Sequence, residues 1–139
     1  HEFGYPYNDI LKLKEFGIPI IEDCAHTFFS QVKDNAIAKV GDFVVYSFPK
    51  MFPIQIGGLL VSNLPDKVIG TNHINNRSLR YIKDVLSHYI EKDTEIIQRR
   101  VSNYKFLRNK FLSLGFEERF TLHPIQFQGC LCLRPEVIY

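Results

Sequence analysis

The sequence predicts an α/β protein, because short apolar runs typical of strands alternate with segments of helical periodicity. The strand-like runs are Ile18–Glu22 and Phe43–Ser47, which are rich in β-branched or aromatic residues, and the apolar run Leu59–Ser62. Apolar residues recur every three or four positions in the segments predicted as helices, which are Asp9–Phe16, Ser78–Tyr89 and Asp93–Leu114. The two periods together indicate a sheet with flanking helices.

The N-terminal elements have recognisable boundaries. Asn8 is a suitable N-cap for the helix over Asp9–Phe16, and Gly17 is a typical stop signal. The run Ile18–Glu22 shows no polar alternation, which predicts a strand buried on both faces. Residues 24–31 are predicted to form a short helix or an irregular turn.

The second and third predicted strands are joined by a segment that cannot pair regularly. Pro49 and Pro53 lack the N–H groups that a ladder requires. Gly57 and Gly58 permit a tight backbone before the third strand. This segment places Lys50 between two apolar strands.

The C-terminal part is predicted to contain two helices and two further strands. Gly115 is expected to end the longer helix, which begins near Asp93. The strands are predicted over Phe116–Phe120 and Ile125–Leu133.

Composition excludes several classes of function. The chain has 139 residues, of which 45% are hydrophobic and 23% charged, with a formal net charge of +2. No basic stripe with interleaved aromatic residues is present, which argues against nucleic acid as a partner. No apolar run approaches the roughly 20 residues that span a membrane. The three cysteines, Cys24, Cys130 and Cys132, give no disulfide framework or zinc spacing, and they fit a cytoplasmic protein without a metal.

Two residues are candidates for chemistry, each with a simpler alternative. Lys50 is either a solvated lysine in a turn or a desolvated amine that could react with a carbonyl compound. Asp23 follows an apolar strand, and ligands of open α/β sheets bind beyond the carboxyl ends of strands. The alternative for Asp23 is a helix cap.

Three motifs carry a resemblance to a known family. They are His1-Glu2-Phe3-Gly4-Tyr5-Pro6, Ile21-Glu22-Asp23-Cys24-Ala25-His26, and Ser47-Phe48-Pro49-Lys50 with Gly57-Gly58 beginning seven residues after the lysine. In this order and with these approximate spacings, the first 62 residues resemble the DegT/DnrJ/EryC1/StrS aminotransferases. The segment Arg99–Tyr104 resembles, less specifically, the family's connection into its small domain.

The resemblance implies a fold, an activity and a cofactor. Residues 1–100 would be part of a fold type I large domain, with a mainly parallel sheet, flanking helices and connecting helices, and residues 101–139 would begin the small C-terminal domain. Family members use pyridoxal 5'-phosphate to aminate keto-sugar nucleotides, with glutamate as the expected amino donor. They serve surface-polysaccharide or secondary-metabolite biosynthesis and are expected to act as homodimers.

The resemblance also assigns roles to individual residues. Lys50 would condense with the cofactor aldehyde, and Asp23 would keep the pyridine nitrogen protonated. His26 would hydrogen-bond near the ring oxygen, and Ser47 would contact the phosphate. Glu22 should point to the opposite side of the strand from Asp23. His1 is expected to support a turn rather than to act in catalysis.

Several departures from the family pattern favour an alternative. Lys50 follows Ser47 by three residues, whereas many members have five, and Ile56 replaces a common acidic residue. The family's phosphate loop and the aromatic residue that stacks on the cofactor ring have no counterpart in this sequence. We therefore expect a partial chain that is inactive alone. The alternative is a truncated or degenerate relative that serves as a structural or interaction module. Lys50 argues against the family's sugar dehydrases, which typically carry histidine there.

Overall fold

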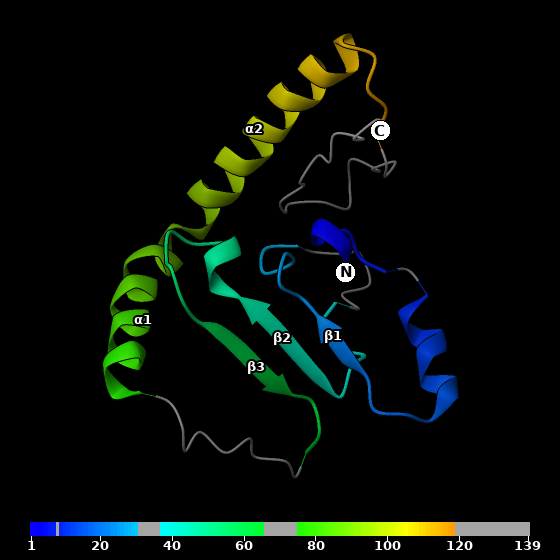
Figure 1. The fold of residues 1–139 in the computed structure, drawn as a ribbon, viewed down its shortest axis with the longest axis vertical. Coiled ribbons are helices and arrows are strands. Elements are labelled where there is room, and N and C mark those ends of the chain that lie inside the picture. The colour runs from blue at the N-terminus through cyan, green and yellow to red at the C-terminus, as the bar shows by residue number, and fades with distance from the viewer. Residues whose placement is uncertain (8, 31–36, 66–74, 119–139) are drawn as a thin grey trace.

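A computed structural model describes residues 1–7, 9–30, 37–65 and 75–118. Its strands form one three-stranded sheet in the order β1-β2-β3. The strands are β1 (Ile21–Asp23), β2 (Phe43–Ser47) and β3 (Gly58–Ser62). The helices are the 3-10 turns η1 (Glu2–Gly4), η2 (Ile10–Phe16), η3 (Phe48–Lys50) and η4 (Ile90–Lys92), and the α-helices α1 (Asn76–Tyr89) and α2 (Asp93–Ser113). Figure 1 shows α1 beside β3, η2 on the β1 side of the sheet, and α2 leading away from the strands.

The sheet is mixed. β1 pairs in parallel with β2, with Asp23 opposite Val45, and β2 pairs antiparallel with β3, with Ser47 opposite Gly58. This confirms the α/β class, while the described strands contain one parallel and one antiparallel pair rather than a mainly parallel sheet. The parallel pairing brings the carboxyl ends of β1 and β2 to the same edge.

Most predicted elements are present near their expected positions. The strand Phe43–Ser47 is found as predicted, and the long helix ends at Ser113, shortly before Gly115 with a φ of 86°. The predicted helix at 9–16 is a 3-10 helix that ends at Gly17, whose φ of 64° lies in the left-handed region. Residues 116–118 belong to the strand predicted at 116–120, but they are described and form no strand. Asn8, residues 119–120 and the strand predicted at 125–133 lie outside the described residues.

The first strand was predicted incorrectly. It begins at Ile21 rather than Ile18, and it is not buried on both faces, because Ile18 and Ile21 are 65% and 67% exposed. The cause lies at Ile20, whose N–H donates to Asp42 Oδ2 at 2.7 Å and whose carbonyl accepts from Asp42 N at 2.8 Å. The Ile20 carbonyl also accepts from Phe43 N at 3.2 Å, but its N–H is taken by the Asp42 side chain, so paired residues begin at Ile21.

An aromatic cluster joins the connection between β2 and β3 to the two long helices. Its buried members are Phe29, Phe48, Met51, Phe52 and Ile54. The half-buried residues that pack against them from α1 and α2 include Ile82, Val85, Leu86, Ile96 and Ile97. These contacts hold the start of α2 against the segment that contains Lys50.

The two faces of the sheet differ in what covers them. Val44 is fully buried and packs with Cys24 and Ile37, whereas Val45 is 39% exposed on the other face. Ile21 and Leu60, which share the face of Val45 by strand alternation, are also exposed. Within the described part of the chain, one face is therefore packed and the other is open.

None of the described helices is long and apolar enough to cross a membrane. The predicted boundary between domains falls near residue 100, inside α2, which continues without a break from Asp93 to Ser113. That boundary stays a prediction.

Candidate active site

Lys50 ends η3, the turn that follows β2. The turn is closed at its base by Phe48 N, which donates to Gly57 O at 3.1 Å, and by Met51 N, which donates to Phe48 O at 2.9 Å. Gly57 has a φ of 109°, and a Cβ atom there would lie 2.9 Å from Ile82 Cδ1. The positive φ therefore favours glycine at position 57, and a Cβ atom there would also displace the Ile82 side chain.

The side chain of Lys50 is exposed. The sequence left two alternatives for Lys50, a solvated lysine in a turn and a desolvated reactive amine. The described residues do not supply the desolvation that the second alternative requires. Within the described ranges, no hydrogen bond or ion pair of Lys50 Nζ is found. The main chain of Lys50 is held instead: its carbonyl accepts from Arg100 Nη2 at 3.0 Å.

Asp23 ends β1 at the same edge of the sheet as Ser47 ends β2. Its side chain is exposed, and Oδ1 accepts from Ala25 N at 2.9 Å. This two-residue pattern caps a turn and not a helix, so the helix-cap alternative does not describe it. No hydrogen bond to Asp23 Oδ2 is made by the residues that the structure describes.

Ser47 lies on the same face of the sheet as Asp23. Asp23 pairs with Val45, and Ser47 is two residues further along β2, so alternation returns its side chain to that face. The serine is half-buried and its side chain makes no capping bond to η3. Its hydroxyl is thus placed at the carboxyl end of β2 with donor capacity remaining.

His26 is close enough to the ends of β1 and β2 that the charges of Asp23 and Lys50 both affect its pKa. Its ring is half-buried and lies against Phe3, with the ring centroids 5.8 Å apart. Burial lowers the pKa of His26, the positive charge of Lys50 lowers it further, and the negative charge of Asp23 opposes both. The structure therefore brings Lys50, Asp23 and His26 within electrostatic reach of one another.

Glu22 lies on the opposite face from Asp23, as predicted, and is only 2% exposed. Its carboxylate accepts from the main-chain N–H groups of Ala38 at 2.8 Å and Val40 at 2.7 Å, and also from that of Gly41. Three amides of one loop therefore converge on this carboxylate.

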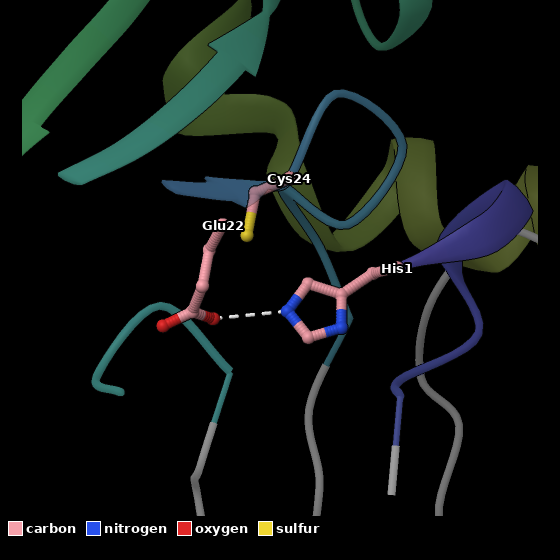
Figure 2. Close-up of side chains that lie close together, drawn as sticks. All are labelled: His1, Glu22 and Cys24. Carbon is pink, nitrogen blue, oxygen red and sulfur yellow. Dashed lines mark hydrogen bonds and ion pairs between the residues drawn. The ribbon is translucent and has the colours of Figure 1, made fainter. Parts of the chain in front are cut away.

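Figure 2 shows the His1 ring pointing at the Glu22 carboxylate, with the Cys24 sulfur beside them. The three side chains could offer metal ligands within 4.8 Å of one another. However, His1 Nδ1 accepts from Tyr7 N at 3.0 Å, which places the ring hydrogen on Nε2, 2.9 Å from Glu22 Oε2. Both nitrogens and both carboxylate oxygens are occupied by hydrogen bonds. The cluster is a structural network, and His1 supports a turn as expected.

Two residues near the site were not singled out from the sequence. Phe3 was named only within a motif, and Arg100 only within a helical segment. For Arg100 a signal exists, because it falls on the same helical face as Ile96 and Ile97, where an unpaired charge would be costly. For Phe3 no such signal exists.

Comparisons with known proteins give one match. No curated protein and no solved structure matches the chain. The model of the DegT/DnrJ/EryC1/StrS aminotransferase family matches residues 8–89, which is more than half of the chain and includes Asp23, His26, Ser47 and Lys50. The chain therefore belongs to the DegT/DnrJ/EryC1/StrS aminotransferase family.

Proposed function

We propose that this protein is a pyridoxal 5'-phosphate-dependent aminotransferase that aminates a keto-sugar nucleotide, with glutamate as the amino donor. One observation carries the proposal. The parallel pairing of β1 and β2 sets Asp23, Ser47 and Lys50 at the carboxyl ends of adjacent strands, where α/β sheets bind ligands. Membership of an aminotransferase family supplies the reaction class.

The side chains at this edge fit the cofactor chemically. Lys50 offers an exposed amine for the aldehyde, and Asp23 offers an exposed carboxylate with one oxygen outside the described hydrogen bonds. Ser47 offers a hydroxyl donor on the same face as Asp23. An amine, a carboxylate and a hydroxyl are the groups that the aldehyde, the pyridine nitrogen and the phosphate require.

Each residue has a defined task in this proposal. Lys50 Nζ would hold the cofactor by its aldehyde carbon and would move a proton during amino transfer. Asp23 would hold a proton on the pyridine nitrogen by ion pairing. When bound, the cofactor would supply an electron sink for the substrate carbon.

His26 would act as a neutral donor. Because burial and the charge of Lys50 lower its pKa, the ring is mainly uncharged at neutral pH. A neutral imidazole has one N–H to donate, which suits a contact with the cofactor's ring oxygen.

The proposal extends to assembly and location. Lys50 is exposed in the described chain, and a homodimer partner or further segments of the same polypeptide would supply the missing cover. The expected setting is the cytoplasm, in a pathway for surface polysaccharide or a secondary metabolite. The three cysteines without a disulfide framework support this location.

The test is chemical trapping at Lys50. A polypeptide that contains this chain together with the further family segments is purified, mixed with pyridoxal 5'-phosphate, reduced with borohydride and digested, and the labelled peptide is identified by mass spectrometry. We expect a visible absorption band before reduction and the label on the peptide that contains Lys50. Lys50→Ala should abolish both signals. Lys12→Ala should change neither, because Lys12 is exposed on η2 and paired with Asp9 at 2.7 Å.

The same experiment decides between the two candidate functions. Label on a lysine other than Lys50 would overturn the assignment. A folded protein that takes no label would favour the alternative, a degenerate relative that acts as a structural or interaction module. The exposed Lys50 and the open sheet face with Ile21 and Leu60 are the observations that favour this alternative.

A further inference from the structure

Arg100 connects α2 directly to the residue that carries the proposed reactive amine. Its Nη2 donates to Lys50 O at 3.0 Å, and its Nη1 lies 3.5 Å from Met51 O. Lys50 and Arg100 are separated by 50 positions in the sequence, so this is a tertiary contact and not a local one. The family match ends at residue 89 and does not include Arg100.

The contact falls where η3 needs a donor. The last carbonyl groups of a helix have no partner within the helix. Upstream, the turn is secured by Met51 N and Phe52 N, which both donate to Phe48 O, at 2.9 and 2.8 Å. A planar guanidinium presents its N–H groups as a fork, and Arg100 directs that fork at the carbonyls of Lys50 and Met51.

Arg100 is itself held in place. Ile96 and Ile97, one turn earlier on α2, pack against the aromatic cluster that contains Met51 and Phe52. Arg100 is half-buried, whereas its neighbour Arg99 points to solvent and pairs with Glu95 at 2.8 Å, with an exposed fraction of 78% for the Arg99 side chain. Two adjacent arginines thus occupy different environments on the same helix.

Arg100 also acts on the rest of the site. Its positive charge contributes to lowering the pKa of His26, after burial and the charge of Lys50. The side chain of Lys50 is exposed, and none of the described hydrogen bonds or ion pairs involves its Nζ. The direction of the amine therefore depends on how firmly the main chain at Lys50 is fixed.

We propose that Arg100 is a positioning residue that fixes the main chain of Lys50, and thereby directs the amine toward the edge formed by Asp23 and His26. This inference rests on the proposed role of Lys50 as the cofactor-binding lysine. It adds to that proposal a restraint from α2, which also enters the segment predicted to lead into the small domain. Cofactor capture and the position of α2 are thereby coupled.

The first test needs no cofactor. Amide hydrogen exchange over residues 48–54 is measured in the unmodified chain and in Arg100→Gln, Arg100→Lys and Arg99→Gln. We expect Arg100→Gln to speed exchange at Met51 and Phe52 by about tenfold or more, because the turn loses its link to α2. Arg100→Lys should recover part of the protection, since a cationic donor group remains but lacks the fork that reaches both carbonyls. Arg99→Gln should match the unmodified chain.

The second test measures capture of pyridoxal 5'-phosphate by borohydride trapping. Arg100→Gln should lower the initial rate of labelling at Lys50 about tenfold, Arg100→Lys should lower it less, and Arg99→Gln should leave it unchanged. Circular dichroism checks that each variant is folded. If Arg100→Gln proves unfolded, the comparison of Arg100→Lys with Arg99→Gln decides: a slower rate in the lysine variant supports the proposal.

The outcomes separate this inference from the proposed function. Equal exchange and equal labelling in folded Arg100→Gln and Arg99→Gln would overturn the role of Arg100. Labelling that survives Lys50→Ala would instead overturn the role of Lys50, whereas the exchange experiment would still report whether Arg100 fixes the turn. Faster exchange with unchanged labelling would show that Arg100 is structural only, and would also overturn the proposal.

Discussion

Glu22 and Asp23 are adjacent carboxylates at the end of one strand, yet their surroundings are opposite. Glu22 is 2% exposed and accepts hydrogen bonds from three main-chain amides and from His1. Asp23 is exposed, and the described structure gives its side chain one hydrogen bond, from Ala25 N. Strand alternation alone separates the two side chains onto different faces of the sheet.

The difference shows how a strand end can be fixed on one side and left available on the other. On the Glu22 side, the carboxylate holds the loop of Ala38, Val40 and Gly41 through three main-chain amides and also accepts from His1. On the Asp23 side, Oδ1 accepts from Ala25 N, and none of the described hydrogen bonds involves Oδ2, which is therefore available to a ligand. A rigid support and an accessible carboxylate thus come from consecutive residues.

Glu22→Ala should produce the largest loss of stability. It removes the acceptor for three main-chain N–H groups, and each unsatisfied buried group costs roughly 1–3 kcal/mol. We expect the free energy of unfolding in urea to fall by about 3 kcal/mol or more. Glu15→Ala, at an exposed position on η2, is the control and should change it little. A loss below about 1 kcal/mol for Glu22→Ala would show that solvent replaces the carboxylate.

Asp23→Asn should leave the fold intact and impair the chemistry. The amide oxygen can still accept from Ala25 N, so the free energy of unfolding should change by less than about 0.5 kcal/mol, as for ordinary surface substitutions. Without the negative charge, the pyridine nitrogen would lose its ion pair. In a polypeptide that also contains the further family segments, we expect amino transfer to fall by about a hundredfold or more, while borohydride still traps the cofactor. Near-normal turnover would return Asp23 to a role in the turn only.

Val44 and Val45 test the same contrast in the apolar residues of β2. Val44 is fully buried beside Cys24 and Ile37, whereas Val45 is 39% exposed. Val44→Ala removes two buried carbon atoms at about 0.8 kcal/mol each and leaves a cavity, so we expect a loss of about 2 kcal/mol. Val45→Ala should cost less than about 0.5 kcal/mol. Equal losses in urea unfolding would mean that something covers the open face in solution.

The smallest expected effect is the pH dependence contributed by His26. Its pKa in the folded state is lowered, chiefly by burial, so the unfolded chain binds the proton more readily. The stabilisation is complete above the unfolded pKa of about 6.5 and declines as the pH falls through the folded value. His26→Gln should flatten the stability profile below about pH 6.5. A profile of unchanged slope would indicate that other groups dominate this range.

The sequence predicted those strands and helices whose boundaries are set by neighbouring residues, such as β-branched runs, glycines and prolines. The strand Phe43–Ser47 was predicted because β-branched and aromatic residues form a run between Gly41–Asp42 and Pro49. The start of β1 was not predictable in the same way. It depends on Asp42, which is 22 positions from Ile20 in the sequence and whose side chain accepts from the Ile20 N–H. The hydrophobic periodicity of a sequence contains no information about a hydrogen bond between residues so far apart.

The sequence predicted which residues form the candidate site, but it did not predict how exposed or how tightly held their side chains are. Motif and strand position indicated Lys50 and Asp23, and the parallel pairing of β1 and β2 places both strand ends at one edge. The exposure of Lys50 and the closed network around Glu22 were not predictable, because both depend on which segments fold over each face. Arg100 could have been noticed as a charge on an apolar helical stripe, but the sequence does not say that it meets Lys50.

The antiparallel return of β3 has a consequence for the order of folding. The β2–β3 hairpin closes over the short connection 48–57, whereas β1 must meet β2 across residues 24–42, and Arg100 must meet Lys50 across 50 positions. The entropy lost on closing a loop grows with its length, so the hairpin with Lys50 is expected to form first. During synthesis, the lysine turn can fold before Arg100 has left the ribosome. The turn would therefore gain its restraint from α2 late, as one of the final steps in assembling the site.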